Sequence, residues 1–235
     1  MEGYTELKNY RYERKFVSDI SHKGKIDILL RMHPFIFNSL FVPRQVNNIY
    51  FDTPGMDCYF DNLFGVAQRW KARIRWYGEI GMEIKQPILE LKIKHGHLGT
   101  KRSWRLNEIQ FDGKRPEQDI IKEVLIQSGL PKDVENRLLG MNPVLVNNYQ
   151  REYFSSFDKR YRITLDDKLE YRPFPLAFYE KNKVFEEKSK IVLELKYDFE
   201  NDKEASKITN AIPFRLNKNS KYVIGMGFLR PGIAI

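Results

Sequence analysis

Four cationic side chains alternate along residues 68–77, QRWKARIRWY, where Arg69, Lys71, Arg73 and Arg75 occupy every second position. A β-strand sends alternate side chains to opposite faces, so this spacing predicts a strand with one cationic face and one apolar face. Guanidinium groups present fork-shaped donors that suit phosphate oxygens, and ammonium groups present a compact positive charge. The cationic face therefore either faces water or binds an anion.

Charged faces of the same kind recur on other segments with a period of two. Glu90, Lys92 and Lys94 alternate with aliphatic side chains, and so do Glu194 and Lys196. One such face alone is most simply solvated, but several cationic faces in one sheet repel one another unless anions neutralise them. A sheet closed into a barrel would turn these faces toward a wet lumen that attracts phosphate groups, with the apolar faces outside.

The elements that must position these side chains follow from the hydrophobic periodicity. Period-two segments predict strands at residues 9–17, 46–51, 68–77, 88–94, 99–106, 147–154, 161–166, 191–197 and 220–225. Helical spacing predicts helices at residues 24–33, 115–129 and 199–212, another after Pro131, and a short one after the turn at 53–55. We therefore expect an α+β fold in which antiparallel β-strands close into a tunnel-like barrel with a charged lumen and helices packed outside.

The composition bounds the class of protein. The 235 residues are 42% hydrophobic and carry a formal net charge of +9, which predicts a folded globular chain with affinity for polyanions. No repeat or linker interrupts the chain, so we expect a single domain over residues 1–235. The single cysteine, Cys58, excludes an internal disulfide. Because a signal peptide and a run of roughly 20 apolar residues are both absent, we expect a cytoplasmic location.

Ordered motifs along the chain resemble those of a known family. Between Arg11 and Gly225 they are RYERKF, NNIYFDTP, KARIRWY, ILELKIK, KRSW, YQREYF, RITLD, VLELKY and NSKYVIG. In this order they are similar to the VTC (vacuolar transporter chaperone) polyphosphate polymerase domain, a member of the triphosphate tunnel metalloenzymes. The resemblance implies the same tunnel-like barrel that the charged faces predict.

The resemblance also assigns roles to individual side chains. The basic residues that it implies as catalytic are Lys15, Arg73, Arg75, Lys92, Arg151 and Arg162. Those that it implies as further phosphate-binding residues are Lys101, Tyr149, Ser220 and Lys221. The implied metal ligand is Glu194, and Glu13 and Glu90 are further candidates.

The activity that the resemblance implies is a metal-dependent polyphosphate polymerase. It would transfer the terminal phosphoryl group of ATP, or of another nucleoside triphosphate, to a growing inorganic polyphosphate chain. Fixed cations and a divalent Mn or Mg ion would neutralise the charge on the transferred group, and glutamate oxygens suit such an ion. The end of a polyphosphate chain is already anionic, so the acceptor needs no general base. We expect any coupling to export to require a separate membrane partner.

Two other classes of function stay open at this point. The hydrolytic branch of the tunnel enzymes opens with Glu-x-Glu-x-Lys, whereas this chain has Arg11 at the first of these positions. This exchange of a carboxylate for a cation disfavours a triphosphatase or polyphosphate hydrolase. A non-catalytic module that binds polyphosphate or RNA is the other alternative. Nucleic acid is disfavoured, because KARIRWY lacks the glycine-aromatic pattern of an RNA-recognition strand.

Overall fold

The computed structural model describes residues 11–96, 98–176 and 184–233. Its strands are β1 (Arg11–Asp19), β2 (Phe37–Asp52), β3 (Gln68–Tyr77), β4 (Glu83–Ile84), β5 (Ile88–His95), β6 (Leu98–Arg105), β7 (Ile109–Gln110), β8 (Asn142–Ser156), β9 (Tyr161–Pro173), β10 (Phe185–Glu187) and β11 (Lys190–Asp198). Its helices are α2 (Lys23–Met32), α3 (Asp57–Phe64), α4 (Glu117–Gln127), α5 (Lys132–Leu139), α6 (Asp202–Thr209) and α7 (Lys221–Leu229). Short 3₁₀ turns join some of them.

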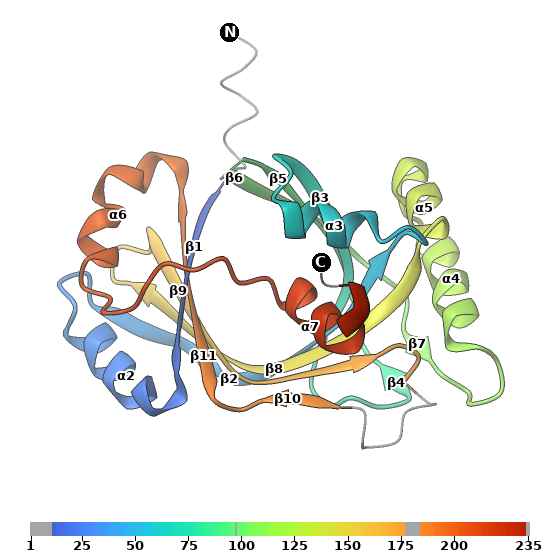
Figure 1. Cartoon of the computed structure of the whole chain (residues 1–235), viewed down its shortest axis with the longest axis horizontal. Helices are drawn as coiled ribbons and strands as arrows, with labels where there is room; N and C mark the ends of the chain where they lie inside the picture. The colour runs from blue at the N-terminus through green and yellow to red at the C-terminus, as the bar shows by residue number, and fades with distance from the viewer. Residues whose placement is uncertain (1–10, 97, 177–183, 234–235) are drawn as a thin grey trace, which may run out of the picture.

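Eight of the strands form a closed antiparallel barrel (Figure 1). Its order is β9, β11, β1, β6, β5, β3, β2 and β8, and β8 closes the ring by pairing with β9. The seam between β1 and β6 holds a single registered pair, Arg11 with Gly99. β10 pairs with the part of β9 that extends past β11, and β4 and β7 form a separate small sheet. The predicted fold class is therefore confirmed.

The helices cover two outer sides of the barrel, as the apolar strand faces require. On one side lie α4 and α5 (Figure 1), and their Leu125 and Leu138 belong to the same buried core as Ile74 and Trp76 of β3. On the other side, α2 and α6 belong to a second core that contains Leu193 of β11. Burying each large side chain of this kind stabilises the fold by roughly 1.5–3 kcal/mol, so the outward apolar faces hold the helices in place.

Helix α7 lies inside the barrel rather than on its outer surface (Figure 1). Tyr222 stacks on Tyr50 of β2 with ring centroids 5.3 Å apart. A Cβ atom at Gly225 would lie 2.6 Å from Tyr171 and 2.8 Å from Leu145, so only glycine allows this close approach. The apolar side of α7 therefore fills one part of the lumen against β2, β8 and β9.

The strand predicted at residues 220–225 is wrong, because these residues begin α7. The run from Tyr222 to Leu229 is apolar on nearly every side, and such a run does not distinguish a buried helix from a buried strand by periodicity. Ser220 favours the helix over the strand, because its Oγ accepts a hydrogen bond from the Val223 N–H and so caps the first turn of α7.

The other predicted elements are present with shifted ends. β3 spans residues 68–77 as predicted, and the strand predicted at 9–17 is β1, although residues 9 and 10 lie outside the described residues. The predicted helices at 24–33 and 115–129 are α2 and α4. The helix predicted at 199–212 is shorter, since α6 ends at Thr209 before Pro213. None of the described helices is long and apolar enough to cross a membrane.

Candidate active site in the barrel lumen

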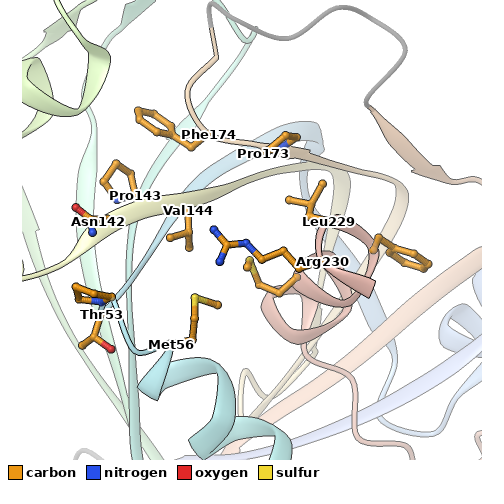
Figure 2. A pocket seen from close by; sticks show the side chains of 12 residues that line it. Thr53, Met56, Asn142, Pro143, Val144, Pro173, Phe174, Leu229 and Arg230 are labelled. Carbon is orange, nitrogen blue, oxygen red and sulfur yellow. The ribbon is translucent and has the colours of Figure 1, made fainter. Parts of the chain in front are cut away.

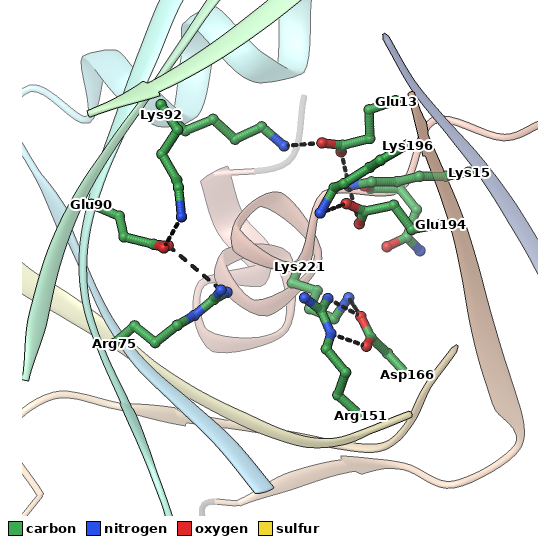
Figure 3. A network of polar contacts seen from close by, with 12 residues as sticks. Glu13, Lys15, Arg75, Glu90, Lys92, Arg151, Asp166, Glu194, Lys196 and Lys221 are labelled. Carbon is green, nitrogen blue, oxygen red and sulfur yellow. Dashed lines mark hydrogen bonds and ion pairs between the residues drawn. The ribbon is translucent and has the colours of Figure 1, made fainter. Parts of the chain in front are cut away.

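The lumen holds a cavity of about 870 Å³ between the strand walls and the N-terminal end of α7. Of the described residues that line it, twelve are lysine or arginine, and three, Glu13, Glu194 and Asp202, are acidic. Figure 3 shows the charged side chains converging on the lumen from opposite walls, with α7 behind them. Such an excess of enclosed positive charge favours a polyanionic ligand.

Glu90 on β5 organises the first cluster of the lumen. Its carboxylate lies 2.6 Å from Nη2 of Arg73, 2.5 Å from Nζ of Lys101 and 3.6 Å from Nη1 of Arg75. Burial raises the pKa of Glu90, but the charges of these three cations outweigh it and hold the pKa below its usual range. Glu90 is therefore ionised, and its oxygens orient the two guanidinium groups.

Glu13 on β1 and Glu194 on β11 form the second cluster, on the opposite wall (Figure 3). Nζ of Lys15 lies 3.0 Å from Glu13 and 3.7 Å from Glu194. Lys92 donates to Glu13 at 2.5 Å, and Lys196 contacts Glu194. Burial raises the pKa of Glu194, yet the neighbouring lysines hold it well below its usual range. Both carboxylates are therefore ionised, and both face the lumen.

Asp166 on β9 holds the third cluster. Arg151 of β8 binds its two carboxylate oxygens at 2.5 and 2.7 Å, and Nζ of Lys221 from α7 donates to it at 2.6 Å. Burial raises the pKa of Asp166, but Arg151 and Lys221 together lower it to about 2. One buried carboxylate therefore fixes a guanidinium group from the barrel wall and an ammonium group from the internal helix.

Tyr149 joins the first and third clusters. Its hydroxyl accepts a hydrogen bond from Nη2 of Arg75 at 3.1 Å, and Nζ of Lys221 lies 4.6 Å from its ring centroid. Burial raises the pKa of Tyr149, but the charges of Arg151 and Arg75 lower it to about 8. The phenol therefore lies between the Arg75 and Arg151 guanidinium groups and next to Lys221.

Lys71 on β3 differs from Lys15, Lys92, Lys196 and Lys221 because no salt bridge to it occurs within the described part of the chain. Its Nζ donates to Oγ of Ser220 at 2.7 Å, next to the N-terminus of α7. Burial and the charges of Lys15 and Lys92 lower the pKa of Lys71 well below its usual value. A phosphate group beside it would favour its charged form, and the helix N-terminus also favours anions.

The structure brings most of the predicted site residues together. Those that line the cavity are Glu13, Lys15, Arg73, Arg75, Lys92, Tyr149, Arg151, Glu194, Ser220 and Lys221. Glu90 and Lys101 are not part of the cavity lining, but Glu90 accepts from Arg73, which lines it, and Lys101 donates to Glu90. Arg162 is exposed on β9, where it pairs with Lys196 in register, and it lies outside the cavity lining.

The set of predicted site residues omitted several side chains that the fold brings to the lumen. Lys71 and Lys196 occupy the same alternating positions as predicted residues, so the period of two could have found them. The segment before α7 carries no such signal. There the backbone carbonyl of Asn219 accepts from Nζ of Lys15 at 2.8 Å, and only the tertiary fold reveals this contact.

A divalent metal would find its donors at Glu13 and Glu194. No group of three or more His, Cys, Asp or Glu side chains arranged for a metal occurs among residues 11–96, 98–176 and 184–233. Mg and Mn, however, are commonly held by one or two carboxylates together with substrate phosphates. Thr164, which pairs with Glu194 in register, has a buried hydroxyl oxygen without a hydrogen-bond partner in the described structure. Glu13 and Glu194 each contact two lysines, but they share Lys15, so the two carboxylates and this oxygen together fit a hard divalent ion. Glu90 is instead engaged by three cations and has no such carboxylate partner among the ion pairs of the described residues.

A second cavity of about 660 Å³ lies between the C-terminal end of α7, β8 and β9. Figure 2 shows Arg230 pointing into it among Val144, Pro143 and other mainly apolar side chains. A single cation in an apolar wall cannot neutralise a chain of phosphates. The lumen cavity is therefore the better candidate for a polyanion site.

Comparisons with known proteins agree with this geometry. The family model of the VTC domain matches residues 10–230. A solved structure from Hippeastrum, described as an adenylyl cyclase with a dominant triphosphatase activity, has a TM-score of 0.50 at 15% identity over 96% of this chain and 97% of its own. A protein from Vibrio parahaemolyticus described as an adenylate cyclase has a TM-score of 0.50 at 10% identity over 91% and 97%. The search of curated proteins gave no match. The two solved structures show the fold alone, and the family match shows that the chain belongs to the VTC domain family.

Proposed function

We propose that this chain is a metal-dependent polyphosphate polymerase that transfers the terminal phosphoryl group of ATP to an inorganic polyphosphate chain in the lumen. The observation that supports this proposal is the pairing of the lumen carboxylates. Glu13, Glu90, Asp166 and Glu194 each contact two or more lysine or arginine side chains. None of these four is left to act as a general base on water, which favours transfer to an acceptor that is already anionic.

The lumen cations have distinct roles in this proposal. Arg73 and Arg75 are held in place by Glu90 and would bind the transferred phosphoryl group through their forked donors. Arg151 and Lys221 would bind the neighbouring phosphates, because Asp166 already orients both. Positioning and charge neutralisation of this kind are the main requirements of phosphoryl transfer. The bond to the leaving ADP breaks as the bond to the terminal polyphosphate oxygen forms.

Glu194 and Glu13 would hold a Mn or Mg ion that neutralises negative charge on the phosphate oxygens. Lys15 lies between the two carboxylates and would keep a phosphate oxygen close to them. Lys92 and Lys196 flank the same pair and would balance the charge of a longer chain. The side chains of this wall therefore bind and orient the acceptor.

The test is to incubate the purified chain with ATP and Mn, with and without a short polyphosphate primer. Phosphorus NMR would follow the internal phosphates, and a gel would resolve long chains. We expect internal-phosphate signal to grow in step with ADP. Arg73→Ala should lower turnover at least about 100-fold. Arg102→Ala is the matched control, because Arg102 lies on the outer face of β6 beside Asp133 and should not affect turnover.

A triphosphatase is the second candidate, because the Hippeastrum neighbour is described with a dominant triphosphatase activity. Release of orthophosphate without chain growth would identify this activity and overturn the polymerase. Retention of polyphosphate with no turnover, reversed by raised salt, would instead identify a non-catalytic polyanion-binding module.

A further inference from the structure

The two ends of the barrel lumen differ in chemistry. Along the lumen face of β3, Arg69 lies near one end and Tyr77 at the other. The end at Arg69 is basic, because Lys94 pairs with Arg69 in register and both line the cavity. The end at Tyr77 is aromatic, because Phe41 of β2 and Tyr153 of β8 lie there with Arg44. We name Phe41, Arg44, Tyr77 and Tyr153 the aromatic rim.

The strand register places the aromatic rim next to the phosphate-binding cations. Arg44 pairs directly with Arg151, and Tyr77 lies two residues after Arg75 on the same face of β3. Residues paired across an antiparallel ladder have Cα atoms only about 4.5–5.5 Å apart. The aromatic rim is therefore adjacent, by strand pairing or by two residues along a strand, to Arg151 and Arg75, which line the lumen cavity.

The geometry of the aromatic rim suits a flat ring. The guanidinium carbon of Arg44 lies 4.4 Å from the ring centroid of Phe41 and 5.8 Å from that of Tyr77. Phe41 meets Tyr153 edge-to-face with centroids 5.6 Å apart. Phe41 is 48% exposed and Tyr77 is 45% exposed, so both rings keep open surface. Exposed rings and a guanidinium plane together form a surface on which a nucleobase stacks.

We propose that the aromatic rim binds the nucleoside of the triphosphate donor, so that the donor enters from this end and the product leaves past Arg69 and Lys94. This inference rests on the proposed function, because it assumes that the donor is a nucleotide whose phosphates lie at Arg75 and Arg151. An inorganic phosphate chain has no base to stack, so exposed rings would add little to its binding affinity. The basic end would raise that affinity, because each cation there neutralises a phosphate.

The test compares binding of two ligands that do not turn over, β,γ-methylene-ATP and a methylene-bridged tripolyphosphate without a nucleoside. Isothermal titration calorimetry would measure both for the wild-type chain and for Phe41→Ala, Tyr77→Ala and Arg44→Lys. The last variant keeps the charge and removes the flat guanidinium group. We expect each variant to bind the nucleotide analogue at least about fivefold more weakly and to bind the tripolyphosphate within about twofold of wild type.

Phe199→Ala is the matched control, because Phe199 is 46% exposed and stacks on Tyr12, which lines the cavity at its other end. It should leave the ratio of the two affinities unchanged. A selective loss of nucleotide binding in Phe199→Ala, or equal losses for both ligands in the rim variants, would overturn the nucleoside site while leaving the proposed function intact. Failure of the wild-type chain to bind either ligand would overturn both.

Discussion

Arg151 and Asp166 face each other across β8 and β9 and form a two-pronged ion pair, with nitrogen-to-oxygen distances of 2.5 and 2.7 Å. Asp166 is completely buried, and it also accepts from Lys221 on α7. A buried carboxylate with two cationic partners keeps both cations in place. In the proposed function, this ion pair both stabilises the fold and orients two groups that bind phosphate.

Asp166→Asn should remove this charge and leave two buried cations close together. We expect the free energy of unfolding to fall by about 3–5 kcal/mol, as when one partner of a buried ion pair is lost. Tripolyphosphate should then raise the melting temperature of the variant more than that of wild type, because its charge replaces the missing carboxylate. Differential scanning fluorimetry with and without tripolyphosphate measures both effects.

Asp158→Asn is the control for this experiment. Asp158 pairs with Arg160 in the turn after β8, where both side chains are partly exposed, so its loss should lower stability far less than the loss of Asp166. An equal gain in melting temperature for wild type and Asp166→Asn would show that phosphate does not take the place of this carboxylate.

Glu194→Gln and Glu90→Gln should separate the metal ligands from the carboxylates that only orient arginine. Glu194 shares Lys15 with Glu13, a neighbouring carboxylate, whereas Glu90 is held by Arg73, Arg75 and Lys101. We expect Glu194→Gln to raise the Mn concentration at half-maximal activity at least about tenfold. Glu90→Gln should lower the maximal rate with no change in that concentration. If Glu90→Gln alone shifted the metal titration, the assignment of Glu194 and Glu13 would be wrong.

Phosphate affinity should fall as the pH rises through about 8. The pKa of Lys92 is lowered to about 8, chiefly by burial, and the pKa of Tyr149 is also about 8. Below this pH, Lys92 is charged and Tyr149 is neutral, so both favour an anion. Above it, Lys92 loses a positive charge and Tyr149 gains a negative one, so the lumen becomes less positive. Calorimetric titration of methylene-bridged tripolyphosphate between pH 6.5 and pH 9.5 measures the fall.

Tyr149→Phe should make this pH dependence shallower, because it removes one of the two titrating groups and keeps the ring. Tyr77→Phe removes a phenol from the rim and is the matched control. A pH profile unchanged by Tyr149→Phe would mean that the phenol stays protonated throughout this range.

The barrel could be predicted from the sequence because the alternation that identifies each strand lies within a few consecutive residues. Each strand alternates charged and apolar residues, as β3 does from Gln68 to Tyr77, so both its type and its two faces follow from spacing. Short strands such as β4 and β7 carry too few residues for a pattern. The first part of β2 is exposed and irregular, with register shifts near Phe41, and it gave no alternation to detect.

The pairing of charges in the lumen could not be predicted in the same way, because it depends on the register between neighbouring strands. Lys92 of β5 donates to Glu13 of β1, although β6 lies between these strands in the barrel order. The stagger of a closed barrel sets such contacts, and no short stretch of sequence encodes it. The position of α7 is likewise a tertiary result, because its apolar run would also suit a buried strand.

Gly225→Ala tests whether the position of α7 inside the barrel controls the site. The added methyl group would overlap Tyr171 and Leu145, which lie within 3 Å of the required Cβ position. We expect the free energy of unfolding to fall by about 1–3 kcal/mol. Activity should fall as well, because a shift of α7 moves Lys221 away from Asp166. Thermal melts and the phosphorus NMR assay measure the two effects on the same sample.

Gly227→Ala supplies the contrast within the same helix. No atom lies within 4 Å of the Cβ position at Gly227, so alanine meets no obstacle there. Alanine is also the better helix former, and we expect a gain of about 0.5–1 kcal/mol in stability with no loss of activity. Opposite effects of the same substitution two residues apart would locate the close contact on the face of α7 that carries Gly225 and meets the barrel wall. Equal effects would contradict the close contact of α7 with Tyr171 and Leu145.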